Sequence, residues 1–214
     1  MKSKIFLQLI ILCFSASIAW AQPIKDKEAI QWVKDKGNNL LEIFAENDIK
    51  KKHSQLDKMF MEYVDMDYIS KFVVGKYWKA MTEEQQSQFQ ALFRRYALAV
   101  YKNFPLDFDR RADFTVKEVD RTEKFTDVIV ALSVQLGPDA TQMVDVQLVF
   151  RLVKSGKNIK IIDLKLNESS LILSYRGRFY EMILKDDEEM EWFLDDFRDL
   201  TEKMELNVRK DEGR

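Results

Sequence analysis

The chain has 214 residues and a formal charge of −2 at pH 7, from 34 basic and 36 acidic side chains. This length suits one domain and is enough to bury a core. No basic block has the density of a nucleic-acid-binding surface, so nucleic acid is excluded as an expected partner. Six glycines and three prolines are too few for long linkers, which indicates a single folded unit.

Residues 1–21 have the layout of a secretory signal peptide. A basic start, MKSK, precedes the apolar run IFLQLIILCFSASIAW, and Ala19-Trp20-Ala21 gives an A-x-A cleavage pattern before Gln22. A retained membrane anchor is disfavoured, because the run is shorter than the roughly 20 residues of a spanning helix and contains polar side chains. Cleavage would also remove Cys13, the only cysteine. We therefore expect an exported protein without disulfides, held together by its core.

Residues 23–104 carry the spacing of amphipathic helices. Apolar side chains recur every three or four positions on both sides of Gly37-Asn38-Asn39, which we expect to break the first helix. A later helix is predicted to begin with a capping box of Thr82 and Gln85. Pro105 is expected to end that helix, because proline cannot continue the hydrogen-bond pattern.

An aromatic stripe runs along this later helix and the turn before it. Tyr77 and Trp78 lie in the turn, and Phe89, Phe93, Tyr96 and Tyr101 share one face of the helix. A stripe at helical spacing is usually core. It can also line a cavity for an apolar ligand between helices and a curved sheet. The spacing leaves both interpretations open.

Residues 112–166 change to a period of two, which predicts an antiparallel meander with one apolar and one mixed face. The segment DFTVKEV is expected to form an edge strand. Turns are predicted at Gly137-Pro138-Asp139 and at Ser155-Gly156-Lys157-Asn158. The side chains expected to share the apolar face are Val128, Val130, Leu132, Val134, Leu136, Val144, Val146, Leu148, Phe150, Leu152, Ile162, Leu164 and Leu166.

Residues 170–204 return to helical spacing, and the charged segment 205–214 is expected to fray as a tail. Helices, then strands, then helices imply an α+β fold, with several helices packed on one face of a curved antiparallel sheet of about four strands. We expect residues 22–204 to form a single domain.

Groups that could carry catalysis or bind a metal are scarce. The mature chain would keep one histidine, His53, which follows three lysines and is expected to be solvated. Asp65 and Asp67 are expected to cap a helix, and the acidic run 186–189 to complement a helix dipole, not to bind calcium. Asp163 lies in a strand with one wet face, so we expect it to be exposed, although a buried acid there would be a candidate general base. No cofactor or metal site is predicted.

Two segments resemble the MlaC family, also known as the toluene-tolerance family. The first is VVGKYWKAMTEEQQSQFQALFRRYALAVY, and the second is NIKIIDLKLNESSLILSYRGRFYEMI, where Glu168-Ser169 stands in place of the family's Glu-Gly. The resemblance extends from about residue 25 to about residue 204. The matching residues are Gly75, Lys76, Tyr77, Trp78, Glu84, Gln85, Phe89, Phe93 and Tyr101 in the first segment, and Asp163, Glu168, Ser170, Leu171, Tyr175, Arg176 and Phe179 in the second.

The resemblance implies an NTF2-like fold with added helices and a deep apolar cavity that holds the acyl chains of a phospholipid. It also implies a carrier in the periplasm of a Gram-negative bacterium. Such a carrier shuttles lipid between an outer-membrane lipoprotein complex and an inner-membrane ABC transporter with an MCE subunit, and so maintains the lipid asymmetry of the outer membrane. The carrier would not be an enzyme, and phospholipid would be its cargo, not a cofactor.

On this hypothesis the cavity is lined by the apolar sheet face and the helical stripes. The predicted lining residues are Tyr77, Trp78, Phe93, Tyr96, Val146, Leu148, Phe150, Leu164, Tyr175 and Phe179. Two alternatives stay open. One is a small NTF2-like enzyme that uses Asp163, and the other is a periplasmic adaptor whose apolar residues are all core and which binds no lipid.

Overall fold

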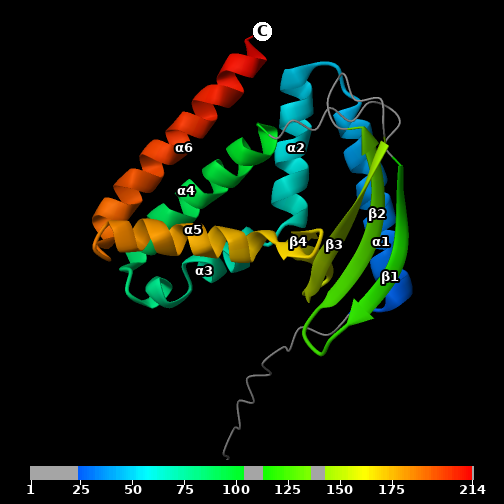
Figure 1. Ribbon diagram of the computed structural model, residues 1–214, viewed down its shortest axis with the longest axis horizontal. Helices are drawn as coiled ribbons and strands as arrows, with labels where there is room; N and C mark the ends of the chain where they lie inside the picture. Colours follow the sequence, from blue (N-terminus) through cyan, green and yellow to red (C-terminus); the bar gives the residue numbers. More distant parts are fainter. Residues whose placement is uncertain (1–23, 104–112, 136–142, 214) are drawn as a thin grey trace, which may run out of the picture.

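The computed structural model describes residues 24–103, 113–135 and 143–213, and it has the predicted α+β fold (Figure 1). The predictions for Pro105, Leu136 and the turn at 137–139 fall outside these residues. The helices are α1 (Asp26–Phe44), α2 (Ile49–Tyr63), α3 (Met66–Val74), the 3-10 helix η1 (Gly75–Lys79), α4 (Glu83–Lys102), α5 (Leu171–Lys185) and α6 (Met190–Glu212). The strands are β1 (Asp113–Arg121), β2 (Thr126–Gln135), β3 (Met143–Ser155), β4 (Asn158–Leu166) and β5 (Ser169–Ser170).

The sheet is an antiparallel meander in the order β1-β2-β3-β4-β5. It has five strands where about four were predicted, because the short β5 adds to the edge of β4. Val130 faces Leu148 on β3, and Phe150 faces Leu164 on β4, so the predicted apolar face is confirmed for these residues.

Ile162 departs from that face because β4 carries a bulge. Asp163 pairs with Arg151, but the next pair joins Ile161 to Leu152, so Ile162 is an extra residue without a partner on β3. A bulge shifts the alternation of the side chains by one position. The prediction that Ile162 shares a face with Leu164 is therefore wrong.

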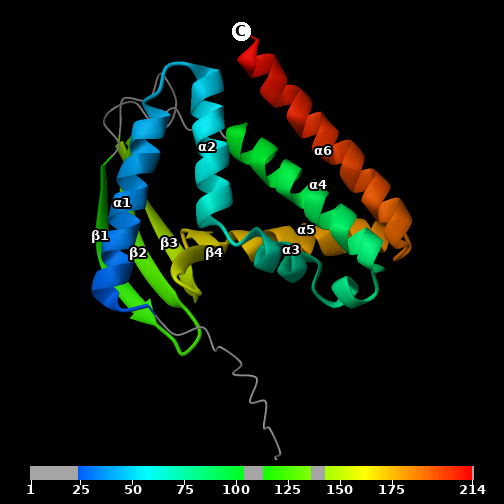
Figure 2. The same cartoon turned by 180° about the vertical axis from the view of Figure 1, so that it is seen from behind.

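Helix α1 covers the apolar face over β1 and β2, as Figure 2 shows from behind. Val33 and Ala29 pack with Val128, Val130 and other sheet residues in one buried cluster. The predicted break at 37–39 is wrong, because α1 continues through it. A Cβ on Gly37 would lie 2.5 Å from the ring of Phe114, so this glycine provides room for a side chain of β1 and does not end the helix.

Helices α3, α4, α5 and α6 form a second layer on the far side of α2 from β1 and β2 (Figures 1 and 2). Their shared core is rich in aromatic residues, and α4 packs along α6. The capping box of Thr82 and Gln85 is confirmed, and Asp65 caps α3 by accepting a hydrogen bond from the Tyr68 amide at 2.9 Å. Local sequence signals therefore place the starts of both helices correctly.

The C-terminal segment is ordered as part of α6, against the expectation that residues from 205 onward fray. Glu205 accepts two hydrogen bonds from Arg95, both 2.8 Å long, and Val208 is buried. Near the end of the helix, Oε1 of Glu212 lies 2.7 Å from Nδ1 of His53. His53 is thus buried at 4 % exposure and not solvated, because α6 extends far enough to cover this part of α2.

Within residues 24–103, 113–135 and 143–213, every helix is too short or too polar to cross a membrane.

Candidate functional site

The predicted lining residues fall into two separate groups. Six of them belong to the core between α3, η1, α4, α5 and α6: Tyr77, Trp78, Phe93, Tyr96, Tyr175 and Phe179. The other four lie on the sheet: Val146, Leu148, Phe150 and Leu164. The structure brings each group together but places the two groups in different layers.

The helical group is tightly packed. Phe93 and Phe179 are each 2 % exposed, and their ring centroids lie 5.8 Å apart. Phe89, at 0 % exposure, contacts both rings and also those of Phe193 and Phe197. Rings at these separations stabilise each other through edge and offset contacts. This arrangement is that of a filled aromatic core.

Two tyrosines at the edge of this core have apolar surroundings. Burial raises the pKa of Tyr175 to about 12, and burial also raises the pKa of Tyr96. A buried phenol resists ionisation because the apolar surroundings stabilise its charge poorly. Both side chains therefore behave as part of the apolar interior.

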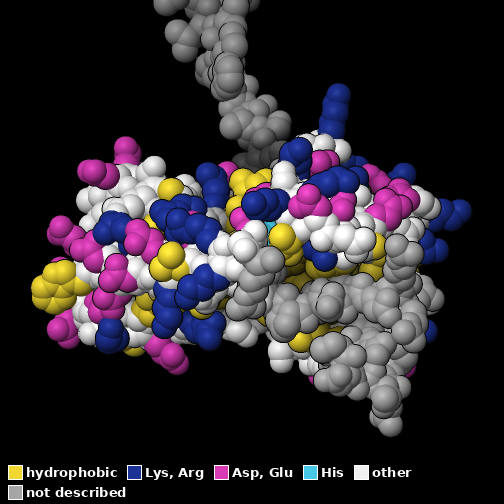
Figure 3. All heavy atoms as spheres, turned by 90° about the horizontal axis from the view of Figure 1, so that it is seen from above, with side chains coloured by type: hydrophobic (Ala, Val, Ile, Leu, Met, Phe, Trp, Pro, Cys, Tyr) yellow, Lys and Arg dark blue, Asp and Glu magenta, His cyan; other side chains and the backbone are white. Residues whose placement is uncertain are grey.

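The sheet group, in contrast, is only half-buried. Val146, Leu148 and Phe150 alternate along the apolar face of β3, and Leu164 stands opposite Phe150. Helix α1 lies over β1 and β2, while α2 lies over β4, so β3 runs between the two helices. Figure 3 shows hydrophobic side chains at the surface on the sheet side of the molecule. This face is the apolar surface best placed to receive a ligand.

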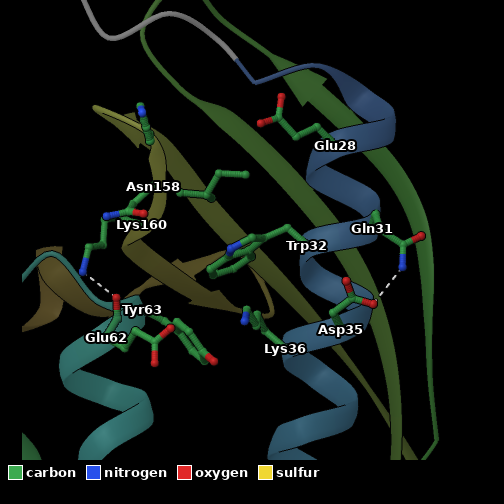
Figure 4. A pocket seen from close by; sticks show the side chains of 11 residues that line it. Glu28, Gln31, Trp32, Asp35, Lys36, Glu62, Tyr63, Asn158 and Lys160 are labelled. Carbon is green, nitrogen blue, oxygen red and sulfur yellow. Dashed lines mark hydrogen bonds between the residues drawn. The ribbon is translucent and has the colours of Figure 1, made fainter.

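A cleft of about 640 Å³ opens between α1, the end of α2 and the turn from β3 to β4 (Figure 4). Trp32 and Tyr63 stand edge to face inside it, with ring centroids 5.6 Å apart. The Lys36 ammonium lies 4.4 Å from the centre of the Tyr63 ring. Ile159, which belongs to the buried sheet cluster, forms part of the wall. Sequence reasoning missed this cleft, because its residues come from segments far apart in the chain and share no motif.

Asp163 is buried at 2 % exposure, so the expectation that it is exposed is wrong. The β4 bulge precedes it, and its carboxylate turns toward the start of α5. There it accepts a hydrogen bond of 2.7 Å from the Ser170 hydroxyl and one of 3.3 Å from the Ile172 amide. Both oxygens are thereby engaged. Asp163 therefore joins β4 to the start of α5 through these two hydrogen bonds.

An ion cluster covers the mixed face of the sheet. Arg151 donates two hydrogen bonds of 2.8 Å to the Asp127 carboxylate, and Lys165 adds a third of 3.1 Å. Burial alone would raise the pKa of Asp127, but the hydrogen bonds from Arg151 and Lys165 outweigh it and lower that pKa. The cluster thus links three neighbouring strands through charge-assisted hydrogen bonds.

The lowered pKa of Asp127 predicts that the folded protein becomes less stable in acid. A carboxylate whose pKa falls on folding stabilises the folded state fully above its ordinary value, near 3.8, and loses that effect as the pH drops below it. We expect Asp127→Asn to reduce stability at pH 7 and to cost less at pH 3 than at pH 7. Urea unfolding at both pH values measures this difference. An equal cost at both would show that the carboxylate charge contributes nothing.

The two segments that carry the family resemblance pack against each other. The Tyr180 hydroxyl accepts hydrogen bonds from the Lys76 amide at 3.2 Å and from Arg176 at 3.0 Å. The ring of Tyr77 meets that of Tyr180 edge to face at 5.1 Å. In the second segment, positive φ angles fall on Asn167 and Glu168 and not on Ser169, so the turn does not need a glycine at Ser169. Much of the shared pattern therefore serves the fold.

The chain matches a solved structure in its fold and a protein family in its sequence. A solved structure of a phospholipid-binding protein from Ralstonia solanacearum, in complex with a phospholipid, superimposes with a TM-score of 0.67 and 21 % identity, covering 82 % of this chain and 98 % of that chain. At this identity the likeness shows a shared fold. No curated protein matches significantly. The family model described as MlaC protein matches residues 34–203. With most of its length covered by that match, the chain belongs to the MlaC family.

Proposed function

We propose that this protein is a phospholipid-binding carrier. The observation that carries the proposal is the half-buried apolar face of β3, with Leu164 beside it on β4, between α1 over β1 and β2 and α2 over β4. Family membership and the fold shared with a structure that holds a phospholipid support the same function. Burying an acyl chain on this face would contribute about 0.8 kcal/mol for each methylene.

The proposed lining consists of Val146, Leu148, Phe150 and Leu164. The six predicted lining residues from the helical layer are assigned to a supporting core, because their side chains fill the space between the helices. This division places the ligand against the sheet and lets the helical layer act as a rigid support. It also explains how an aromatic stripe can accompany lipid binding without touching lipid.

The proposal also includes where the protein works and which membrane complexes it exchanges phospholipid with. Residues 1–21 would direct export to the periplasm of a Gram-negative bacterium. The carrier would exchange phospholipid with an outer-membrane lipoprotein complex and an inner-membrane ABC transporter that has an MCE subunit, as the family resemblance implies. Release to a partner requires that the partner binds the open form of the carrier more tightly than the closed form.

A carrier fits the residues better than an enzyme does. Asp163, the candidate general base, has both carboxylate oxygens engaged by Ser170 and Ile172. Within the described residues no cluster of His, Cys, Asp or Glu side chains could hold a metal ion. The adaptor alternative differs from the carrier in one observable respect, since an adaptor would purify without lipid.

Native mass spectrometry of the purified protein, followed by lipid extraction, tests the proposal. We expect a bound phospholipid in the unaltered protein and at least about a ten-fold loss of retained lipid in Leu148→Arg, because an unpaired charge on the apolar face opposes acyl-chain burial. Gln147→Arg is the matched control, since Gln147 is exposed on the opposite face of β3. Equal lipid retention in both variants, or a lipid-free protein that takes up nothing from vesicles, would contradict the proposal.

A further inference from the structure

Helix α2 meets the C-terminal ends of α4 and α6 through two polar contacts that lie one turn apart on α2 (Figures 1 and 2). Nδ1 of His53 lies 2.7 Å from Oε1 of Glu212 on α6, and Nζ of Lys102 on α4 lies 2.7 Å from Oδ2 of Asp57. His53 and Asp57 are four residues apart, so they share one face of α2. The side chains of His53 and Lys102 are only 5 % and 15 % exposed. We call these four residues the polar junction.

The polar junction is easier to separate than the contact between α4 and α6. Water solvates both members of a polar pair when they part, so a poorly exposed pair adds little net stability. Oδ1 of Asp57 is buried and has no hydrogen-bond partner among the described residues, a cost that water would remove on opening. Apolar contact beside the junction comes from Tyr101 of α4, whose ring lies 5.7 Å from that of Phe60 on α2. Parting α4 from α6 would instead expose the fully buried rings of Phe89 and Phe193.

The opposite end of α2 is fixed to the sheet. The Asp65 amide, just beyond α2, donates a hydrogen bond of 2.9 Å to the Ile161 carbonyl on β4. Lys160, also on β4, donates to the backbone carbonyl of Glu62. When the polar junction parts, α2 would therefore tilt about this fixed end. Since α2 borders the apolar face of β3, such a tilt would change the width of the gap over that face.

We infer that the four residues of the polar junction are positioning residues, which hold α2 beside the β3 face and so set the rate at which phospholipid leaves the protein. They act through α2 and are not part of the proposed acyl-chain lining. The inference rests on the proposed lipid-binding function. Glu212 lies beyond residues 34–203, so its contact with His53 is a feature of this chain outside the family match. Joining α2 to α4 should slow release, and removing a contact of the junction should speed it.

Cross-linking α2 to α4 tests the inference. The chain from Gln22 onward contains no cysteine, so an introduced pair of thiols reacts alone. Asp57→Cys with Lys102→Cys places two thiols across the polar junction, and a short bismaleimide with a cleavable disulfide spacer joins them. The protein is loaded with fluorescent phosphatidylglycerol, and release to excess vesicles of phosphatidylethanolamine and phosphatidylglycerol is followed. We expect the linked protein to release lipid about ten-fold more slowly, and cleavage of the spacer to restore the rate of the unlinked protein.

The matched control joins α4 to α6. Arg95→Cys with Glu205→Cys replaces another ion pair of α4, and the same cross-link there should leave the release rate unchanged. Removing a contact of the polar junction has the opposite sign from linking it. Lys102→Met should speed release about ten-fold, whereas the conservative Lys102→Arg should keep the original rate. Arg95→Met, which also removes an ion pair from α4, should lower stability in urea without speeding release.

The outcomes separate the inference from the function on which it rests. Equal release by the linked and unlinked polar junction would overturn the inference, and so would equal slowing by both cross-links. No measurable release from any variant, Lys102→Met included, would overturn it as well. In each of these cases the protein still holds phospholipid, so the carrier function stands. An unaltered protein that takes up no phospholipid would overturn both.

Discussion

Phe179→Ala should lower the free energy of unfolding by about 3–5 kcal/mol, the cost of removing a large buried aromatic side chain. Phe179 lies at the centre of the helical core, where its ring contacts Phe89, Phe93, Phe193 and Phe197, the last at a centroid distance of 4.9 Å. Alanine would leave a cavity that these rigid rings cannot close. Urea unfolding of the purified protein measures the loss.

The matched control is Leu173→Ala on the same helix, because Leu173 is 58 % exposed. Its cost should stay within about 0.5 kcal/mol. Lipid retention by Phe179→Ala under native conditions should equal that of the unaltered protein. A cost below about 1 kcal/mol, together with a loss of bound lipid, would show that these rings line the ligand cavity and would contradict their assignment as core.

Gly75→Ala should destabilise the protein by about 3 kcal/mol, because the site opposes a side chain in two ways. Gly75 has φ +50°, a conformation that costs other residues about 1–3 kcal/mol. An added Cβ would also lie 2.4 Å from the Tyr180 hydroxyl and 2.6 Å from Nη2 of Arg176. Both side chains would have to move, and the hydrogen bond from the Lys76 amide on η1 to the Tyr180 hydroxyl on α5 would weaken. Thermal or urea unfolding reports the effect.

Gly177→Ala is the control for this prediction. Gly177 lies inside α5, and nothing lies within 4 Å of a Cβ placed on it. Alanine there should stabilise the protein by about 0.5–1 kcal/mol, since glycine inside a helix costs more backbone entropy. Changes of the same sign in both variants would show that the local conformation at Gly75 does not matter.

Sequence patterns predicted the features that depend on neighbouring residues. The period of two gave the strands and their apolar face, because alternation follows from the pleat of a single strand. Thr82 and Gln85 marked the start of α4, since a cap involves only four consecutive residues. The two family segments identified the family without any knowledge of the fold. Each of these signals is complete within a short stretch of chain.

Other features were decided only where distant segments meet. Gly37 breaks no helix because Phe114, on β1, packs against it. His53 is buried because the end of α6 reaches α2, and Asp163 is buried because a bulge and the start of α5 enclose it. The periodic spacing of apolar residues does not reveal these contacts, because it reports only on neighbours within one helix or strand.

The candidate site shows the same division. Alternation along β3 identified Leu148 and Phe150 as members of an apolar face, but only the placement of α1 and α2 leaves that face half-buried. The pattern of the aromatic stripe could not separate core from cavity lining, because both require apolar side chains on one face of a helix. The charged cleft around Trp32 left no signal in the sequence, since its side chains gather only through the tertiary structure. The sequence by itself thus determined the main strands, the starts of α3 and α4 and the family, while burial and the shape of the site depended on long-range packing.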